Sequence, residues 1–313
     1  MTERLNEQGG FDVLSDVLET LRFRGSIFFQ SDLAAPWGIS LATSGIPRFH
    51  IVLSGECFVG SDEEDVLHVR PTDIVMLPNG HYHWIADRPG RQMVADSRAG
   101  EACELGNPLF QQGEITNRIM CGIVHYDQDS PHPILESLPR LLHFPKVGPM
   151  EPIGMTVQMI DAEVRRVKSN RSPILDRMTE VLFLQLLNHY VDNTADSSGF
   201  LVALRDRRLR RALELIHLQP EANWTLASLG EQVGMSRATL VRRFEDAIGV
   251  APMRYIGNWR LLKAHNLVRY TAEPLEQIAE KTGFASARTL GKAFLRQYAM
   301  TPSSLRRKTR NLN

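Results

Sequence analysis

Hydrophobic and polar positions along this chain change their period twice. Near the N-terminus, apolar residues recur at helical spacing and predict an amphipathic helix with Phe11, Leu14, Val17, Leu18 and Leu21 on one side. From Gly25 to Val124 the apolar runs are short, rich in β-branched and aromatic residues, and separated by Gly, Pro, Asp and Ser. This second pattern predicts a small antiparallel sandwich or barrel.

Helical spacing returns after the strand region. One predicted helix begins at His132, a second covers Gly154 to Val167, and a third covers Pro173 to Tyr190. The polar stretch that follows is the best linker candidate. We therefore expect an α+β multidomain chain, with a β-barrel and helical extension in residues 1–191, a linker in 192–205 and an all-helical domain in 206–313.

The C-terminal part contains an internal repeat, with copies at about 225–248 and 275–298. Gly234 and Gly283 are 49 residues apart, whereas the pairs Leu240/Leu290, Phe244/Phe294 and Pro252/Pro302 are each 50 apart. The second copy therefore has one extra residue in its turn. A preserved pattern with such a shift indicates two copies of one supersecondary unit.

Each copy has the features of a helix-turn-helix. A short amphipathic helix ends at a glycine, the residue that best adopts the left-handed conformation. Ser236 or Ser286 then caps the next helix. Within that second helix, apolar residues recur every four positions and face inward. A single such pattern often belongs to an ordinary helical hairpin. Two copies at one spacing favour a DNA-binding helix-turn-helix over that alternative.

The outward faces of the two second helices carry side chains that suit DNA. Arginine can donate two hydrogen bonds to guanine, and small or apolar side chains can approach a thymine methyl group. The candidate DNA-binding residues are Arg237, Ala238, Val241 and Arg242 in the first copy, and Ala287, Arg288, Thr289 and Lys292 in the second.

The last hundred or so residues resemble the DNA-binding domain of the AraC/XylS family of transcriptional regulators. The resemblance rests on Gly234-Met-Ser236 in the first turn, on Gly283-Phe284 in the second, and on the segment from Pro252 to Arg260. It implies that a long helix beginning at Pro252 joins the two units. Because residues 199–313 contain both units and the joining helix, we expect this segment to fold by itself.

The charge distribution agrees with this division. The whole chain is neutral, with 36 Lys and Arg against 36 Asp and Glu. Residues 206–313 hold 19 basic and 9 acidic residues, a net charge of +10, which leaves −10 for residues 1–205. A basic module beside an acidic one is expected if only the C-terminal part contacts phosphates.

Several classes of protein are disfavoured by the sequence. No stretch approaches the roughly 20 apolar residues of a membrane span, and the first residues lack the features of a secretory signal. Three cysteines, Cys57, Cys103 and Cys121, form no spaced framework. We expect a cytoplasmic protein without membrane partners.

Part of the strand region resembles the cupin barrel found before the DNA-binding domain in many AraC-type regulators. The segment from Pro78 to His83 fits the second cupin motif, and Cys121-Gly122 followed by His132-Pro133 fits one subgroup of these sensor domains. The first cupin motif is broken, since its paired histidines and glutamate are missing. The resemblance therefore implies a sensor and disfavours a catalytic metal-dependent cupin.

Four residues are candidates for a ligand or metal pocket in this barrel: His50, His81, His83 and Cys121. His81 and His83 are two apart, so on a strand both would point to one side. Imidazole with a thiolate suits zinc or a similar divalent metal. Contact with a small molecule, cysteine redox sensing and an ordinary hydrogen-bonded core remain open alternatives.

The leading hypothesis is a sequence-specific transcription factor, not an enzyme, that responds to a signal sensed by the cupin-like domain. Its expected partners are double-stranded promoter DNA, RNA polymerase, a small-molecule, metal or redox effector, and a second copy in a homodimer formed by the helical extension. The alternative is a metal-dependent cupin enzyme fused to a DNA-tethering module.

Overall fold

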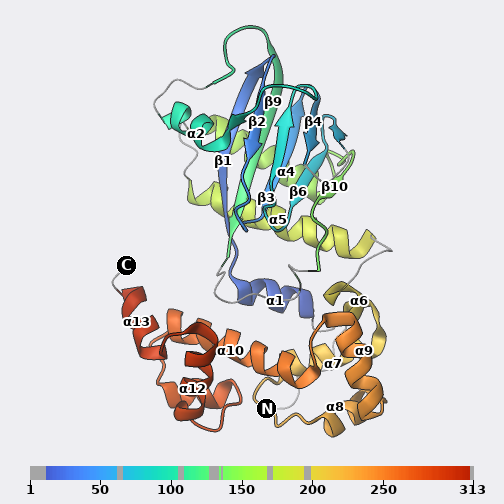
Figure 1. The fold of residues 1–313 in the computed structure, drawn as a ribbon, viewed down its shortest axis with the longest axis vertical. Coiled ribbons are helices and arrows are strands. Elements are labelled where there is room, and N and C mark those ends of the chain that lie inside the picture. Colours follow the sequence, from blue (N-terminus) through green and yellow to red (C-terminus); the bar gives the residue numbers. More distant parts are fainter. Residues whose placement is uncertain are drawn as a thin grey trace. The chain divides into compact units, whose positions relative to one another are not determined.

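The computed structural model describes residues 12–61, 66–104, 109–126, 134, 137–167, 172–193 and 199–310. The chain forms two compact units (Figure 1). We call Phe23–Tyr126 with Leu138–Ala195 the barrel unit, and Met1–Arg22, Asp127–Ser137 and Asp196–Asn313 the helical unit. The predicted fold class, a sheet-rich N-terminal domain and an all-helical C-terminal domain, is confirmed.

The barrel unit contains two five-stranded sheets, with strand orders β1-β9-β3-β6-β10 and β5-β4-β7-β2-β8. Neighbouring strands are antiparallel, apart from β2 and β8. The strands are β1 Arg24–Ala34, β2 Gly38–Leu41, β3 Arg48–Ser54, β4 Cys57–Gly60, β5 Leu67–Val69, β6 Ile74–Leu77, β7 His83–Ala86, β8 Val94–Ala95, β9 Ile115–His125 and β10 Leu142–Phe144.

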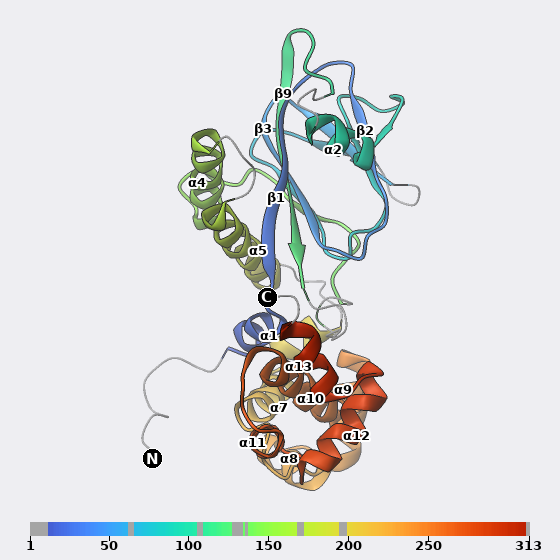
Figure 2. The same ribbon diagram turned by 90° about the vertical axis from the view of Figure 1, so that its left-hand side faces the viewer.

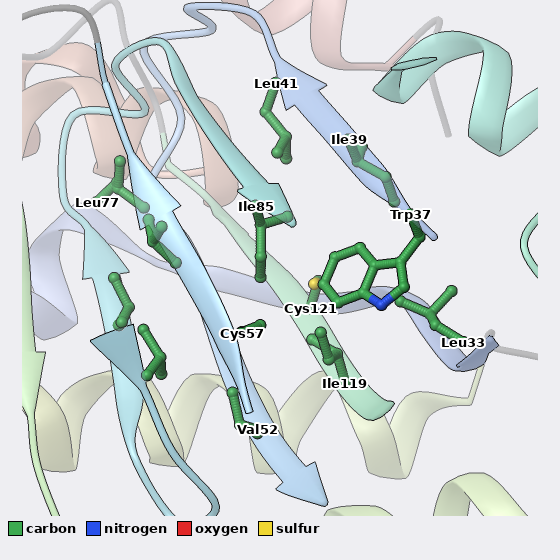
Figure 3. Close-up of a cluster of buried hydrophobic side chains, with 13 residues drawn as sticks. Leu33, Trp37, Ile39, Leu41, Val52, Cys57, Leu77, Ile85, Ile119 and Cys121 are labelled. Carbon is green, nitrogen blue, oxygen red and sulfur yellow. The ribbon is translucent and has the colours of Figure 1, made fainter. Parts of the chain in front are cut away.

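The main core of this unit lies between the two sheets. Apolar side chains such as Val52, Ile85 and Ile119 point into this space, and Figure 3 shows them together with Trp37 in one buried cluster. Because successive side chains on a strand point to opposite faces, every second residue of these strands contributes to this core. The indole N–H of Trp37 donates to Asn117 Oδ1 at 3.0 Å, so the one polar atom of this indole is paired within the core.

Three helices belong to the barrel unit: α2 Asp96–Glu104, α4 Pro152–Arg166 and α5 Pro173–Asn193. Helices α4 and α5 lie on the outer side of the sheet formed by β1, β9 and β3, and the second sheet lies on the other side (Figure 2). They correspond to the second and third predicted helices, which are therefore confirmed. Most of the helix predicted from His132 lies outside the described residues.

The helical unit contains the repeated helices. Its members are α1 Val13–Leu21, α6 Phe200–Arg205, α7 Arg207–Leu218, α8 Leu226–Val233, α9 Arg237–Ile248, α10 Pro252–Tyr270, α11 Leu275–Lys281, α12 Ala287–Tyr298 and α13 Pro302–Arg310. Helix α10 is the predicted joining helix and begins at Pro252. Among the described residues, no helix is both long and apolar enough to cross a membrane.

Helix α1 packs against α7 and α10, although it precedes the whole barrel in the sequence. Its five apolar residues Val13, Leu14, Val17, Leu18 and Leu21 are all buried.

Polar contacts fix the position of this helix. Asp16 accepts from His217 Nδ1 at 2.8 Å and from Lys263 Nζ at 3.1 Å, so one carboxylate joins α1 to both α7 and α10. The side chain of Asn266 donates to the carbonyl of Thr20, and the guanidinium of Arg22 lies 4.1 Å from the ring centre of Tyr270. The apolar side of α1 thus covers a face of the helical unit formed by α7 and α10.

These contacts differ from the predicted boundaries in two places. The predicted first domain includes α1, whereas the compact units group α1 with the C-terminal helices. Residues 200–205, predicted as linker, form α6, in which Phe200 and Leu201 are buried. Apolar burial between residues far apart in the sequence explains both differences. It also means that residues 199–313 alone lack a helix that packs against α7 and α10.

Leu18→Ala should loosen the helical unit rather than the barrel unit. Leu18 is buried in α1, and replacing a buried leucine with alanine costs about 2–5 kcal/mol. Hydrogen-exchange mass spectrometry should show faster exchange in α7 and α10 and unchanged exchange in β3. The exposed neighbour Glu19, changed to alanine, is the control. Faster exchange confined to the barrel strands would contradict the placement of α1.

Candidate functional site

The first helix-turn-helix has the turn that its sequence predicts. Helix α8 ends at Gly234, whose φ of 64° lies in the left-handed region. The next N–H, of Met235, donates back to the carbonyl of Gly230 at 2.9 Å. Ser236 then caps α9, because its hydroxyl accepts from the N–H of Thr239 at 3.2 Å. The turn is closed at both ends by local hydrogen bonds.

The second unit repeats this construction with one more residue. Gly283 has a φ of 74°, and the N–H of Phe284 donates to the carbonyl of Ala279 at 2.8 Å. Ser286 caps α12 by accepting from the N–H of Thr289 at 3.2 Å. The extra residue is accommodated between Phe284 and the serine. Both copies therefore present their second helix after the same kind of turn.

The inner faces of α9 and α12 anchor them in the helical unit. Leu240, Phe244, Leu290 and Phe294 are fully buried. The imidazole of His265 on α10 stacks on Phe294 with ring centres 5.7 Å apart. The joining helix thus packs directly against the second unit.

The outer faces of the same helices carry the predicted DNA-binding residues. Arg237, Ala238, Arg242, Arg288, Thr289 and Lys292 are exposed, and Val241 and Ala287 are half-buried. All eight lie where the sequence pattern places them, away from the buried leucines and phenylalanines. Their base-reading roles stay predictions. The neighbouring Arg243 is different, because its guanidinium pairs with Asp206, the N-cap residue of α7. The sequence offered no signal for that pair.

In the barrel unit, three of the four candidate side chains meet in the interior. His50 Nδ1 lies 2.8 Å from Cys121 Sγ, and His50 Nε2 lies 2.8 Å from His83 Nε2. His83 Nδ1 lies 2.9 Å from the carbonyl oxygen of His81. The pairing of β3 with β9 sets His50 directly opposite Cys121, so strand register creates the first contact. We call these groups the His–Cys chain.

The carbonyl at one end determines the direction of every hydrogen bond in this chain. A carbonyl can only accept, so His83 Nδ1 carries a proton and donates to it. In a neutral imidazole the other nitrogen then accepts, and His83 Nε2 therefore receives the N–H of His50. His50 Nδ1 is left as an acceptor and receives the thiol proton of Cys121. The chain thus holds the cysteine as a thiol.

His81 does not contribute its side chain to this arrangement. The expectation that His81 and His83 point to one side assumed that both lie on a strand. Strand β7 begins at His83, so His81 precedes it and supplies only its backbone carbonyl.

Comparisons with known proteins agree with both parts of the structure. Residues 12–192 match the family described as Cupin, and residues 229–308 match the family described as Helix-turn-helix domain. Over 95% of its length the chain is 26% identical to the HTH-type transcriptional regulator AlkR of Acinetobacter baylyi, 100% of which is covered. It is also 26% identical to MtrA of Neisseria gonorrhoeae, over 95% of this chain and 98% of that one.

Solved structures match either one part of the chain or most of it. An AraC-type regulator structure from Chromobacterium violaceum is 26% identical over 34% of this chain and 96% of its own, with a TM-score of 0.32. ToxT from Vibrio cholerae is 12% identical over 90% of this chain and 96% of its own, with a TM-score of 0.35.

The chain belongs to the AraC-type transcriptional regulators with an N-terminal cupin domain. The regulator therefore combines a His–Cys chain inside a cupin barrel with two helix-turn-helix units. No comparison supports the alternative of a cupin enzyme tethered to DNA.

Burial keeps the His–Cys chain of the regulator uncharged. Desolvation lowers the pKa of His83 to about 4 and places the pKa of His50 well below its usual range. Desolvation likewise raises the pKa of the Cys121 thiol. A buried, protonated thiol is a poor nucleophile and a poor metal ligand.

The geometry of this chain does not fit a metal ion. The two nitrogens of His50 point in opposite directions, one toward Cys121 and the other toward His83, so the three side chains do not converge on one point. Within the described residues, no three His, Cys, Asp or Glu side chains are arranged to hold a metal. A role for His50, His83 and Cys121 in sensing a small molecule or an oxidant stays a prediction. The side chain of Cys103 lies outside the described residues.

Acidification should destabilise the barrel unit through His50 and His83. Their folded-state pKa values lie below the ordinary 6.5, so below that pH the unfolded chain binds protons that the folded chain excludes. Stability should fall as the pH drops from 6.5 toward 4, by about 2 kcal/mol for each histidine between about pH 7 and pH 5. Urea unfolding at the two pH values measures this. The double change His50→Leu/His83→Leu should flatten the dependence, and His81→Leu should not. Equal slopes in all three proteins would contradict the argument.

Proposed function

We propose that the regulator binds promoter DNA as a homodimer and changes transcription in response to a signal received by its cupin domain. The observation that carries this proposal is the pair of capped helices α9 and α12. Each buries its apolar face and exposes arginine, lysine and small side chains on the other. They belong to a region whose net charge is +10. RNA polymerase is the further partner that transcription control requires.

We also propose that the regulator is not an enzyme and acts in the cytoplasm, where its promoter lies. The relatives that match almost the whole chain are named as transcriptional regulators. The titratable side chains in the barrel interior offer no nucleophile to a substrate, because His50, His83 and Cys121 are at most 4% exposed.

Arg242 and Arg288 are the residues that should read bases. Arg242→Ala should weaken binding to the specific site by about 1–3 kcal/mol and relax the preference at one base position, because a bidentate contact to guanine is lost. Quantitative binding to the operator and to random DNA measures the difference. Arg296, which is exposed two turns after Arg288 on α12, provides the control. Arg296→Ala should weaken binding to the operator and to random DNA equally. An equal loss on both DNAs for Arg242→Ala would refute base reading.

The helical extension is the proposed dimer interface. Helices α4 and α5 cover the sheet yet still expose large apolar side chains, and exposed apolar surface commonly marks an interface. Met155 and Met159 lie four residues apart on α4, and Ile174 and Val181 lie seven apart on α5, so each pair shares one face of its helix. These four side chains are 47–55% exposed. A two-fold dimer would bury the same surface on both subunits.

Val181→Glu should convert the dimer to a monomer, because it introduces a charge into a desolvated interface. Sedimentation velocity measures the change. Val66 is the matched control, since it is also 47% exposed but lies beside strand β5. Val66→Glu removes the same side chain and adds the same charge, and it should leave the dimer intact. Dissociation by both changes, or by neither, would refute α5 as the interface.

A further inference from the structure

A cavity of about 270 Å³ lies on the outer face of the sheet that contains β3, below helix α4. Its floor is apolar and comes from the sheet, with Ile51, Leu53 and Ile74. Val147 and Val157 add apolar walls. This cavity is separate from the His–Cys chain, because Ile51 and His50 are neighbours on β3 and point to opposite faces.

The sequence of α4 explains why the space is not filled. The residues that α4 turns toward the cavity are Gly154, Val157, Gln158, Asp161 and Arg165, and among them Val157 alone has an apolar side chain. The larger apolar residues Ile153 and Ile160 are buried elsewhere. Gly154 cannot be replaced by a bulkier residue, because a Cβ atom there would lie 2.1 Å from the carbonyl oxygen of Gly148.

Two ion pairs stand at the polar side of the cavity. Arg118 donates through Nε and Nη2 to Asp32 at 2.5 and 2.9 Å, and Arg165 donates through Nε and Nη2 to Asp161 at 3.1 and 2.7 Å. The formal charges of the four groups cancel, so this edge has no net charge to attract an ionic ligand. A guanidinium carries five N–H donors, and each of these two arginines uses two nitrogen atoms to donate to its carboxylate. Further N–H groups can therefore donate to an uncharged acceptor on a ligand.

We propose that this cavity binds the signal molecule, an uncharged apolar compound with one hydrogen-bond acceptor at an end. The apolar part would cover Ile51, Leu53 and Ile74, and the acceptor would face Arg118 and Arg165. An apolar cavity of about 150 Å³ accommodates benzene, so this one suits a compound of about 10–12 non-hydrogen atoms. This inference rests on the proposed function, in that the compound would act on transcription through the cupin domain.

Strand β3 connects such a ligand to the rest of the barrel. Ile51 and Leu53 would contact the ligand, while the alternate residues His50 and Val52 lie in the interior core. A ligand that favours one position of β3 would therefore favour one packing of the interior. Only such a difference in affinity between two arrangements can shift the regulator between states.

Quinoline and naphthalene test the site on the full-length protein. Both have ten ring atoms and the same shape, and quinoline alone carries a hydrogen-bond acceptor. Calorimetry or fluorescence titration should show one quinoline site per chain with a dissociation constant below about 1 mM. Naphthalene should bind more weakly. Arg165→Leu should reduce this preference for quinoline.

Val157→Phe should fill the cavity and weaken quinoline binding at least tenfold, whereas Val66→Phe, the same change at an exposed position beside β5, should leave it unchanged. If Val157→Phe does not fold, Val157→Leu adds less volume and should give a smaller loss. No saturable quinoline binding, or equal affinity in wild type and Val157→Phe, would overturn the inference. Operator binding by the wild-type protein is measured on the same samples. A wild-type protein that binds quinoline but does not bind operator DNA would count against the proposed function and leave the ligand site intact.

Discussion

Strand β3 buries side chains on both of its faces, and most features of the barrel unit depend on this alternation. His50 and Val52 face the space between the sheets, and Ile51 faces helix α4. A shift of one residue in the pairing of β3 would exchange these two sets. The hydrogen-bonded chain, the packed interior and the apolar floor of the outer cavity would be lost together.

The interior also shows how polar groups are tolerated in a small barrel. A histidine buried without hydrogen-bond partners could cost several kcal/mol, whereas a buried thiol costs less because its S–H is a weak donor. Here each group donates to the next, and the last proton is accepted by a backbone carbonyl. The arrangement needs no ion, and its own three side chains stay uncharged. Asn117 serves the same purpose for Trp37 and for the carbonyl of Glu56.

Features that depend on local sequence could be predicted, and features that depend on distant pairing could not. The two turns follow from Gly234, Ser236, Gly283 and Ser286, whose hydrogen bonds reach only a few residues along the chain. The repeat and the helical period then place the exposed arginines.

The histidine site was predicted only in part. The residue types pointed to a cluster, but its geometry depends on the register between β3 and β9, which pairs residues 71 apart. The inclusion of the His81 side chain failed because the start of β7 cannot be located to within two residues from composition. The docking of α1 joins Asp16 to Lys263 across 247 residues and had no local signal.

The position of helix α1 limits how the regulator can be divided. The chain uses a helix encoded before the barrel to cover helices encoded after it, and only Arg22 and Phe23 separate α1 from strand β1. The DNA-binding part is thus not a cassette that can be exchanged at a single junction. A chimera that joins residues 199–313 to another sensor would carry an uncovered apolar face on α7 and α10. It would have to supply a helix with the spacing of residues 13–21 and an acidic residue at the position of Asp16.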